Sequence, residues 1–282
     1  MKLFVSSSSI KHHKIHHILL KLIESGFYNI ELSGGSNYYK GLKSDIISLQ
    51  NQYDLNLLIH NYFPPPEKHF VLNLASLNNE IYAKTIDHYL SAIDLSKSVG
   101  ADCFSIHAGF LIDPSVEEIG ADISFLQHNM KEKSIERFCC GYNLIKKEAG
   151  HIKIYIENNV LNTKNYQTFK INPFLLTTAN DYFELKKKID FYLLLDLAHL
   201  KVSCTTLGIH LESEFAKLAP LSNYWHISDN NGIFDSNSAF SKNGNIINII
   251  KKYSADIITL EIYDDINTIK GCYHLLSDIY PS

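Results

Sequence analysis

Short apolar runs recur along the chain, and between them lie longer segments in which apolar positions repeat with the period of a helix. Eight of the runs have the length and the aliphatic and aromatic content of strands, and their neighbours are mostly apolar rather than alternating. They lie at residues 2–5, 28–32, 55–60, 103–107, 154–157, 191–196, 224–227 and 257–262. Nearly continuous apolar strands separated by helices are typical of a parallel sheet that is covered on both faces.

Two of the intervening segments have clear helix boundaries. Segment 16–26 ends at Gly26, and segment 76–100 begins at Ser76 or Asn78 and ends at Gly100. The strand–helix repeats fill the chain, so we predict an α/β fold, a single-domain (β/α)8 TIM barrel that spans residues 1–282. A doubly wound open sheet is the alternative, but the sole candidate for its glycine-rich phosphate loop, SGGS at 33–36, is too short.

The composition narrows the class of protein. The chain has 282 residues, of which 45% are hydrophobic, so it can bury a large core. Its net charge is -4, and Arg137 is the one arginine among 26 basic residues, which makes nucleic acid an unfavourable partner. Five cysteines without a Cys-x-x-Cys pair and the lack of a long apolar stretch predict a soluble cytoplasmic protein. Whether it forms a homo-oligomer stays open.

Acidic or imidazole side chains stand at the ends of six consecutive predicted strands. In chain order these are His60, His107, Glu157, Asp196 with His199 just beyond, His226 and Glu261. Burying an ionisable group is costly unless it is paired or binds a metal, and the strand ends of a barrel meet at one mouth. We therefore predict a site for a divalent metal (Mn, Mg, Co or Zn), with a second metal as an open alternative. The first would be held by Glu157, Asp196, His226 and Glu261, and the second by His60 and His107 across a bridging Glu157.

Three other features of the sequence carry less information about function, a run of histidines and two long segments after strands. Four histidines, His12, His13, His16 and His17, offer imidazole pairs four residues apart, which we interpret as the solvated face of the first helix. Segment 61–73, which contains three consecutive prolines, and the segment at about 110–131 follow the third and fourth strands. Both are expected beside the mouth of the barrel, where barrel enzymes keep their active sites.

The order and spacing of these motifs resemble the xylose-isomerase-like TIM barrel superfamily, which includes sugar isomerases and epimerases and the apurinic-site endonucleases. The matching segments are His60 with NYFPPPEKHFVLNLAS, SVGADCFSIH up to His107, IYIENN, LLLDLAH, WHISDNNG and TLEI. The resemblance implies that Glu157, Asp196, His226 and Glu261 form the metal site shared by both branches. It also implies that His60 and His107 match further ligands of the endonuclease zinc cluster, and that His199 matches a ligand of its third zinc.

The chain departs from the endonuclease branch at that third zinc. The branch uses an aspartate and a histidine two residues apart, whereas this chain has Asp235, Ser236 and Asn237. A neutral amide is a poor zinc ligand, so a cluster of three zinc ions is not expected.

Our leading hypothesis is a metal-dependent isomerase or epimerase that acts on a sugar or sugar derivative by proton transfer next to a carbonyl. Glu157 and Glu261 would be the catalytic bases. Substrate hydroxyls would be bound by Glu31, His107, His199 and Asp229, with Tyr62, Phe63 and Trp225 as apolar walls. Two alternatives stay open: a zinc-dependent apurinic-site endonuclease, which cleaves phosphodiesters, and a metal-binding barrel without catalytic activity.

Overall fold

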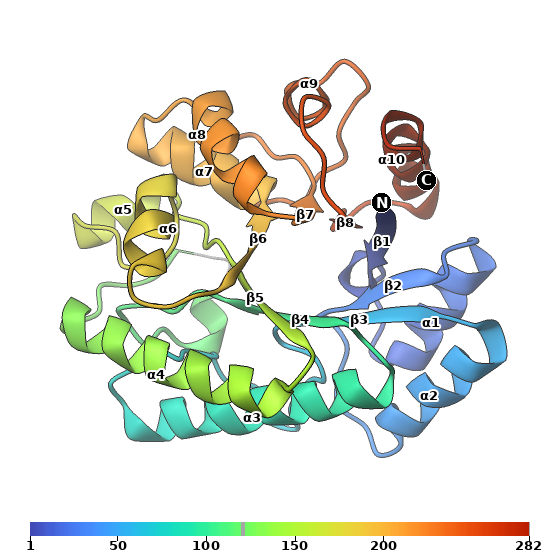
Figure 1. Ribbon diagram of the computed structural model, residues 1–282, viewed down its shortest axis with the longest axis horizontal. Coiled ribbons are helices and arrows are strands. Elements are labelled where there is room, and N and C mark those ends of the chain that lie inside the picture. Colours follow the sequence, from blue (N-terminus) through green and yellow to red (C-terminus); the bar gives the residue numbers. More distant parts are fainter. Residues whose placement is uncertain (120–121, 282) are drawn as a thin grey trace.

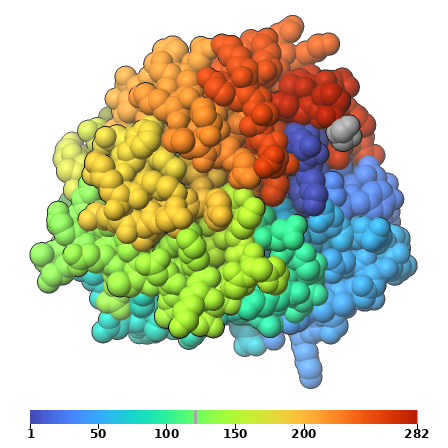
Figure 2. Space-filling view, in the orientation of Figure 1, coloured from blue at the N-terminus to red at the C-terminus, as the bar shows by residue number. Residues whose placement is uncertain are grey.

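The computed structural model describes residues 1–119 and 122–281, and it confirms the predicted barrel (Figure 1). Eight parallel strands close into a ring in chain order, with the last strand paired to the first. The strands are β1 (Lys2–Ser6), β2 (Asn29–Leu32), β3 (Asn56–His60), β4 (Cys103–His107), β5 (Lys153–Glu157), β6 (Tyr192–Asp196), β7 (Tyr224–Ile227) and β8 (Ile257–Leu260). Figure 2 shows the N-terminal residues in dark blue against the red C-terminal part of the chain, where the ring closes.

Helices surround the strands on the outside of the ring (Figure 1). They are α1 (Ile15–Glu24), α2 (Leu42–Tyr53), α3 (Asn79–Ser98), α4 (Lys131–Ala149), α5 (Thr163–Phe169), α6 (Ala179–Lys186), α7 (Leu197–Leu207), α8 (Leu211–Leu218), α9 (Asn245–Ile250) and α10 (Ile266–Ile279). Short 3-10 helices lie at η1 (Ser7–Ser9), η2 (Val116–Glu118) and η3 (Ala219–Leu221). No helix of the described residues is both long and apolar enough to cross a membrane.

The starts of two helices differ from the sequence-based expectation, and a side-chain cap explains one of them. The Asn78 side chain accepts hydrogen bonds from the N–H groups of Glu80 and Ile81, so α3 starts after Asn78 rather than after Ser76. Helix α1 starts at Ile15, and its buried face is made of aliphatic residues. The expectation that His12 and His13 lie on this helix is therefore wrong, because both belong to the loop that precedes it.

Side-chain alternation along β7 shows how the barrel interior is separated from the helix layer. The Tyr224 ring lies 5.6 Å from the ring of His226 and 5.3 Å from that of Tyr155 on β5. Trp225, between Tyr224 and His226, points the other way and packs edge-on against Phe215 of α8 at 5.4 Å. Trp225 is fully buried between strand and helix, so the expectation that it forms a wall of the site is wrong.

The strand register brings the predicted site residues together. His107 on β4 is paired with Glu157 on β5, and Asp196 on β6 is paired with His226 on β7. Since neighbouring strands are parallel and tilted in a barrel, these last or next-to-last residues face one mouth.

Candidate metal centre

Glu157, the last residue of β5, lies at the centre of the cluster. Its Oε2 atom is 3.2 Å from Nε2 of His60 and 3.1 Å from Nε2 of His107. Its Oε1 atom is 3.2 Å from Nδ1 of His226. The two oxygens of one buried carboxylate therefore face two different sets of side chains.

The set on the Oε1 side is rich in carboxylates. Nδ1 of His226 lies 3.4 Å from Oε2 of Glu261 and 3.9 Å from Oδ2 of Asp196. Glu157, Asp196 and His226 each offer one ligand atom within 4.8 Å of the others, and so do His60, His107 and Glu157 on the opposite side. All six residues predicted as first or second metal ligands thus lie in one cluster.

The donor atoms in this cluster fit divalent cations. In the part of the chain that the structure describes, both carboxylate oxygens of Glu157 and Nδ1 of His226 are buried without a hydrogen-bond partner. Buried lone pairs of this kind require a cation or extra protons. Three carboxylates and one imidazole could hold a divalent ion on the Oε1 side, and two imidazoles with Oε2 could hold another.

Further contacts orient the imidazoles towards the cluster. Nδ1 of His60 is 2.7 Å from the Ser105 hydroxyl, which leaves Nε2 facing Glu157. Nε2 of His226 is 3.0 Å from Oε1 of Glu31, and Thr259 donates a hydrogen bond to the other Glu31 oxygen. Glu31 is fully buried behind His226, a position suited to orienting a metal ligand.

Asn158 joins the ends of β5 and β6. Its side chain donates to the carbonyl of Asp196 at 3.0 Å and accepts from the N–H of Asp196 at 2.7 Å, while its own carbonyl accepts from Nδ1 of His199 at 2.8 Å. Asp196 also caps α7 through the N–H of His199. The sequence analysis missed Asn158, although its place directly after Glu157, where the apolar run ends, was a signal.

His199 faces an acidic residue that the sequence analysis named only where the chain departs from the endonuclease branch. Its Nε2 lies 3.2 Å from Oδ2 of Asp235. Asn237 turns its side-chain oxygen to the hydroxyl of Ser228 at 3.1 Å. Asp229 pairs with Lys201 at 2.6 Å.

Burial and charge set the protonation of the cluster. Burial raises the pKa of Asp196 to about 7 and lowers the pKa of His107 to about 4. Burial also acts to raise the pKa of Glu157, but the surrounding imidazoles hold it well below its ordinary value. For Glu261, burial is outweighed by the hydrogen bond and charge of His226, which bring its pKa to about 2. A cation that binds here takes the place of protons.

A cavity of about 320 Å³ lies above the cluster. His60, His107, Glu157, His199 and Glu261 line it, whereas Glu31, Asp196, His226 and Asp229 do not. Its apolar wall consists of Phe110, Ile119, Ile123, Phe174 and Phe234, which lie on the loops after the strands. Tyr62 and Phe63, the other expected walls, are not among its lining residues. The volume is at the lower end of ligand pockets, so the cavity suits a small molecule.

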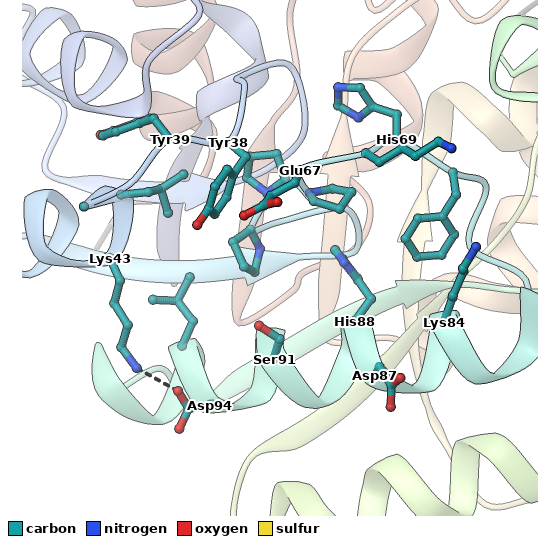
Figure 3. Close-up of a pocket in the computed structure, with 18 of the residues that line it drawn as sticks. Tyr38, Tyr39, Lys43, Glu67, His69, Lys84, Asp87, His88, Ser91 and Asp94 are labelled. Carbon is teal, nitrogen blue, oxygen red and sulfur yellow. Dashed lines mark hydrogen bonds and ion pairs between the residues drawn. The ribbon is translucent and has the colours of Figure 1, made fainter.

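A larger cavity of about 740 Å³ lies on the outer side of the barrel, between α2, α3 and the segment 64–70 (Figure 3). His88 and Ser91 point into it from α3, and Lys43 pairs with Asp94 at its edge at 2.7 Å (Figure 3). No residue of the strand-end cluster lines this cavity. Its ionisable side chains, among them Glu67, His88 and Asp94, are therefore separate from the candidate metal centre.

An eight-stranded parallel barrel with carboxylates and imidazoles gathered at its strand ends defines a TIM barrel with a candidate metal centre. Residues 20–267 match the family model described as xylose isomerase-like TIM barrel, and the chain belongs to that family. A search among curated proteins finds no match.

Solved structures with the same fold include sugar epimerases and an endonuclease. A D-tagatose 3-epimerase-like protein is 19% identical, with a TM-score of 0.73 over 99% of this chain and 97% of the other. An L-ribulose 3-epimerase is 15% identical, with a TM-score of 0.65 over 98% and 92%. Endonuclease IV from Thermus thermophilus is 13% identical, with a TM-score of 0.59 over 99% and 100%. At these identities the similarity shows the shared fold.

Proposed function

We propose that this protein is a divalent-metal-dependent isomerase or epimerase of a small sugar or sugar derivative. The observation that carries the proposal is the pair Glu157 and Glu261, which line a small cavity and lie 3.2 and 3.4 Å from the same nitrogen of His226. The sugar epimerases among the solved structures of this fold support this choice of substrate class.

The ions would be held as described above, by Glu157, Asp196, His226 and Glu261, with His60 and His107 on the other side. A divalent ion held there would supply Lewis acidity to a carbonyl and the neighbouring hydroxyl, which would make the C–H of the hydroxyl-bearing carbon more acidic. The surrounding residues hold the pKa values of both glutamates low, so both are ionised at neutral pH. In this proposal these carboxylates are the proton acceptors.

The other cavity residues would orient the sugar and exclude water. His107 presents its imidazole to substrate hydroxyls, and His199, held by Asn158 and Asp235, lines the cavity beside it. Phe110 and Phe174, whose rings are 5.5 Å apart, offer an apolar surface to the C–H groups of the sugar. Glu31 and Asp229 do not line the cavity, so in this proposal they act through His226 and Lys201 rather than on the substrate.

Solvent exchange tests the proposal. The purified protein, supplied with Mn, Co, Mg or Zn, would be incubated with a panel of aldoses and ketoses in deuterated water. We expect deuterium on the carbon next to the carbonyl, and a loss of roughly a hundredfold or more in Glu157→Gln and Glu261→Gln. Glu67→Gln, a carboxylate on the outer cavity, is the matched control.

Two results would contradict this mechanism. Interconversion without solvent deuterium over many turnovers indicates a hydride shift and removes both glutamates from proton transfer. Absence of any interconversion or exchange across the panel, with metal bound, contradicts the proposed function itself.

One observation favours a second candidate, a zinc phosphodiesterase that cleaves DNA at abasic sites. His60 and His107 on the far oxygen of Glu157 would allow a centre of two metals, an arrangement used in phosphoester hydrolysis. The net charge of -4 and the single arginine oppose binding of duplex DNA. We expect no metal-dependent nicking of an abasic duplex at physiological salt, and efficient nicking would reverse the ranking of the two candidates.

A further inference from the structure

A third cavity, of about 660 Å³, adjoins the candidate metal centre, and we call it the annex. It is formed by the loops at 8–13 and 33–35 together with Tyr263. Ser33 and Tyr263 line both the annex and the cavity of about 320 Å³ above the cluster, which we call the central cavity. The hydroxyls of Ser8 and Tyr263 both donate to Oε1 of Glu261, at 3.1 and 3.0 Å. A molecule bound at the metal centre can therefore extend past Glu261 into the annex.

The annex differs from the central cavity in charge. Lys11, His12 and His13 line it, and none of its lining residues in the described chain is an aspartate or a glutamate. The central cavity, by contrast, contains Glu157, Asp235 and Glu261, and the whole protein has a net charge of -4. A basic hollow on an acidic protein, directly beside the candidate site, favours an anionic group on the bound molecule.

Hydrogen-bond donors without partners reinforce this charge. Nδ1 of His12 accepts from the N–H of Lys14 at 3.0 Å, so Nε2 carries the proton and is a donor. The N–H groups of Gly34 and Gly35 donate to no acceptor among the described residues. Gly35 has a φ of +99°, a conformation that favours glycine. The N–H of Asn37 donates to the carbonyl of His13 at 2.8 Å, which ties the two loops together.

We propose that the annex binds the oxyanion group of an anionic sugar, a phosphate or a carboxylate, while the sugar itself occupies the central cavity. Lys11 supplies a permanent positive charge, and the imidazoles and glycine amides supply donors of the kind that oxyanions accept. The sugar part of this proposal rests on the proposed function, whereas the affinity of the annex for an oxyanion does not. The proposal also gives a role to His12 and His13, which the sequence analysis interpreted as part of a solvated helix face.

Binding measured by titration calorimetry on the metal-loaded protein tests the annex without requiring turnover. The probes are D-fructose, D-fructose 6-phosphate, D-fructuronate and inorganic phosphate. We expect one of the anionic sugars to bind roughly tenfold or more tightly than D-fructose, and Lys11→Gln to remove at least about fivefold of that advantage. Lys14→Gln, in the same loop but outside the annex lining, should change it less than about twofold. The advantage should shrink as salt is raised.

The outcomes separate this inference from the function on which it partly rests. The anionic sugar whose affinity falls in Lys11→Gln shows whether the annex binds a phosphate or a carboxylate. If no sugar binds but inorganic phosphate binds in a Lys11-dependent way, the annex stands and the proposed function fails. Equal affinity for neutral and anionic sugars, equal effects of Lys11→Gln and Lys14→Gln, or no binding of any anion overturns the annex.

Discussion

The two oxygens of Glu157 face regions of different character. On the Oε1 side, His226 and Asp196 are fully buried, and each has a further partner that fixes it. On the Oε2 side, His60 is buried, but 29% of the His107 side chain is exposed towards the cavity. The first side consists of carboxylates around one imidazole, and the second consists of two imidazoles that share a single carboxylate oxygen.

The differences in burial and in ligand charge indicate how one cluster could hold two ions of unequal affinity. Ligands that are already oriented bind a metal without loss of side-chain freedom, and charged ligands attract a divalent ion more than neutral ones. The Oε1 side should therefore hold the tighter ion. The more exposed Oε2 side should hold a weaker ion or leave its coordination positions to substrate.

The largest effect should follow from removing the imidazole of the Oε1 side. In His226→Ala we expect metal affinity to fall by roughly a hundredfold or more, because the variant loses a buried ligand and the imidazole that pairs with Glu31. Metal content after dialysis, measured by mass spectrometry, checks this. His274→Ala, an exposed histidine on α10, is the control. Unchanged metal stoichiometry in His226→Ala would rule out this side as the principal site.

A smaller loss should follow from weakening the support behind that ligand. Glu31→Gln keeps the size of the side chain but removes the charge that faces Nε2 of His226 at 3.0 Å. We expect metal affinity to fall by about 10- to 100-fold while the fold is retained. Competition with a chelator measures the change, and Glu24→Gln on the exposed face of α1 is the control. A variant that binds metal as the parent does would show that Glu31 does not orient His226.

The Oε2 side can be tested separately. In His107→Gln we expect the second equivalent of metal to bind at least about tenfold more weakly, with the first equivalent changed by less than about threefold. Calorimetric titration of metal-free protein resolves the two steps, and His151→Gln is the exposed control. Equal losses at both steps, or a parent protein that binds one equivalent only, would remove the distinction between the two sides.

The same comparison shows what the sequence could predict. The apolar runs revealed all eight strands, and because the cluster residues are the last polar positions of those runs, their convergence followed from the barrel alone. Whether a residue faces inwards depends on strand register and tilt. For that reason Trp225 was misplaced and the position of Glu31 behind His226 was not foreseen.

Loop geometry was the other limit of prediction. The contacts of Asn158 across β5 and β6, and of Asp235 with His199, depend on how loops fold over strand ends, and spacing along the chain does not encode this. The histidines of the first loop had helical spacing, yet α1 begins only at Ile15. Periodicity identifies elements better than it identifies their ends.

The smallest effect concerns the support of the Oε2 side. Asn61 follows His60 with a φ of 33°, and its side-chain oxygen accepts from the N–H of His107 at 3.3 Å. Its carbonyl accepts from Nε2 of His88, the α3 residue that points into the outer cavity (Figure 3). Burial lowers the pKa of His88 to about 4 from the ordinary 6.5, so the folded protein keeps this imidazole neutral.

The unfolded chain binds this proton more readily than the folded one, so His88 makes the protein less stable as pH falls from above 6.5 towards 4. Between pH 7.5 and 6 the loss due to His88 should be about 1 kcal/mol in the free energy of unfolding. His88→Gln retains a donor for the Asn61 carbonyl but does not titrate. Urea unfolding of both proteins at the two pH values isolates this contribution, because the other groups titrate alike in both. If the stability difference between parent and variant does not change with pH, His88 is not held neutral by the fold, and the support of the Oε2 side does not depend on its protonation.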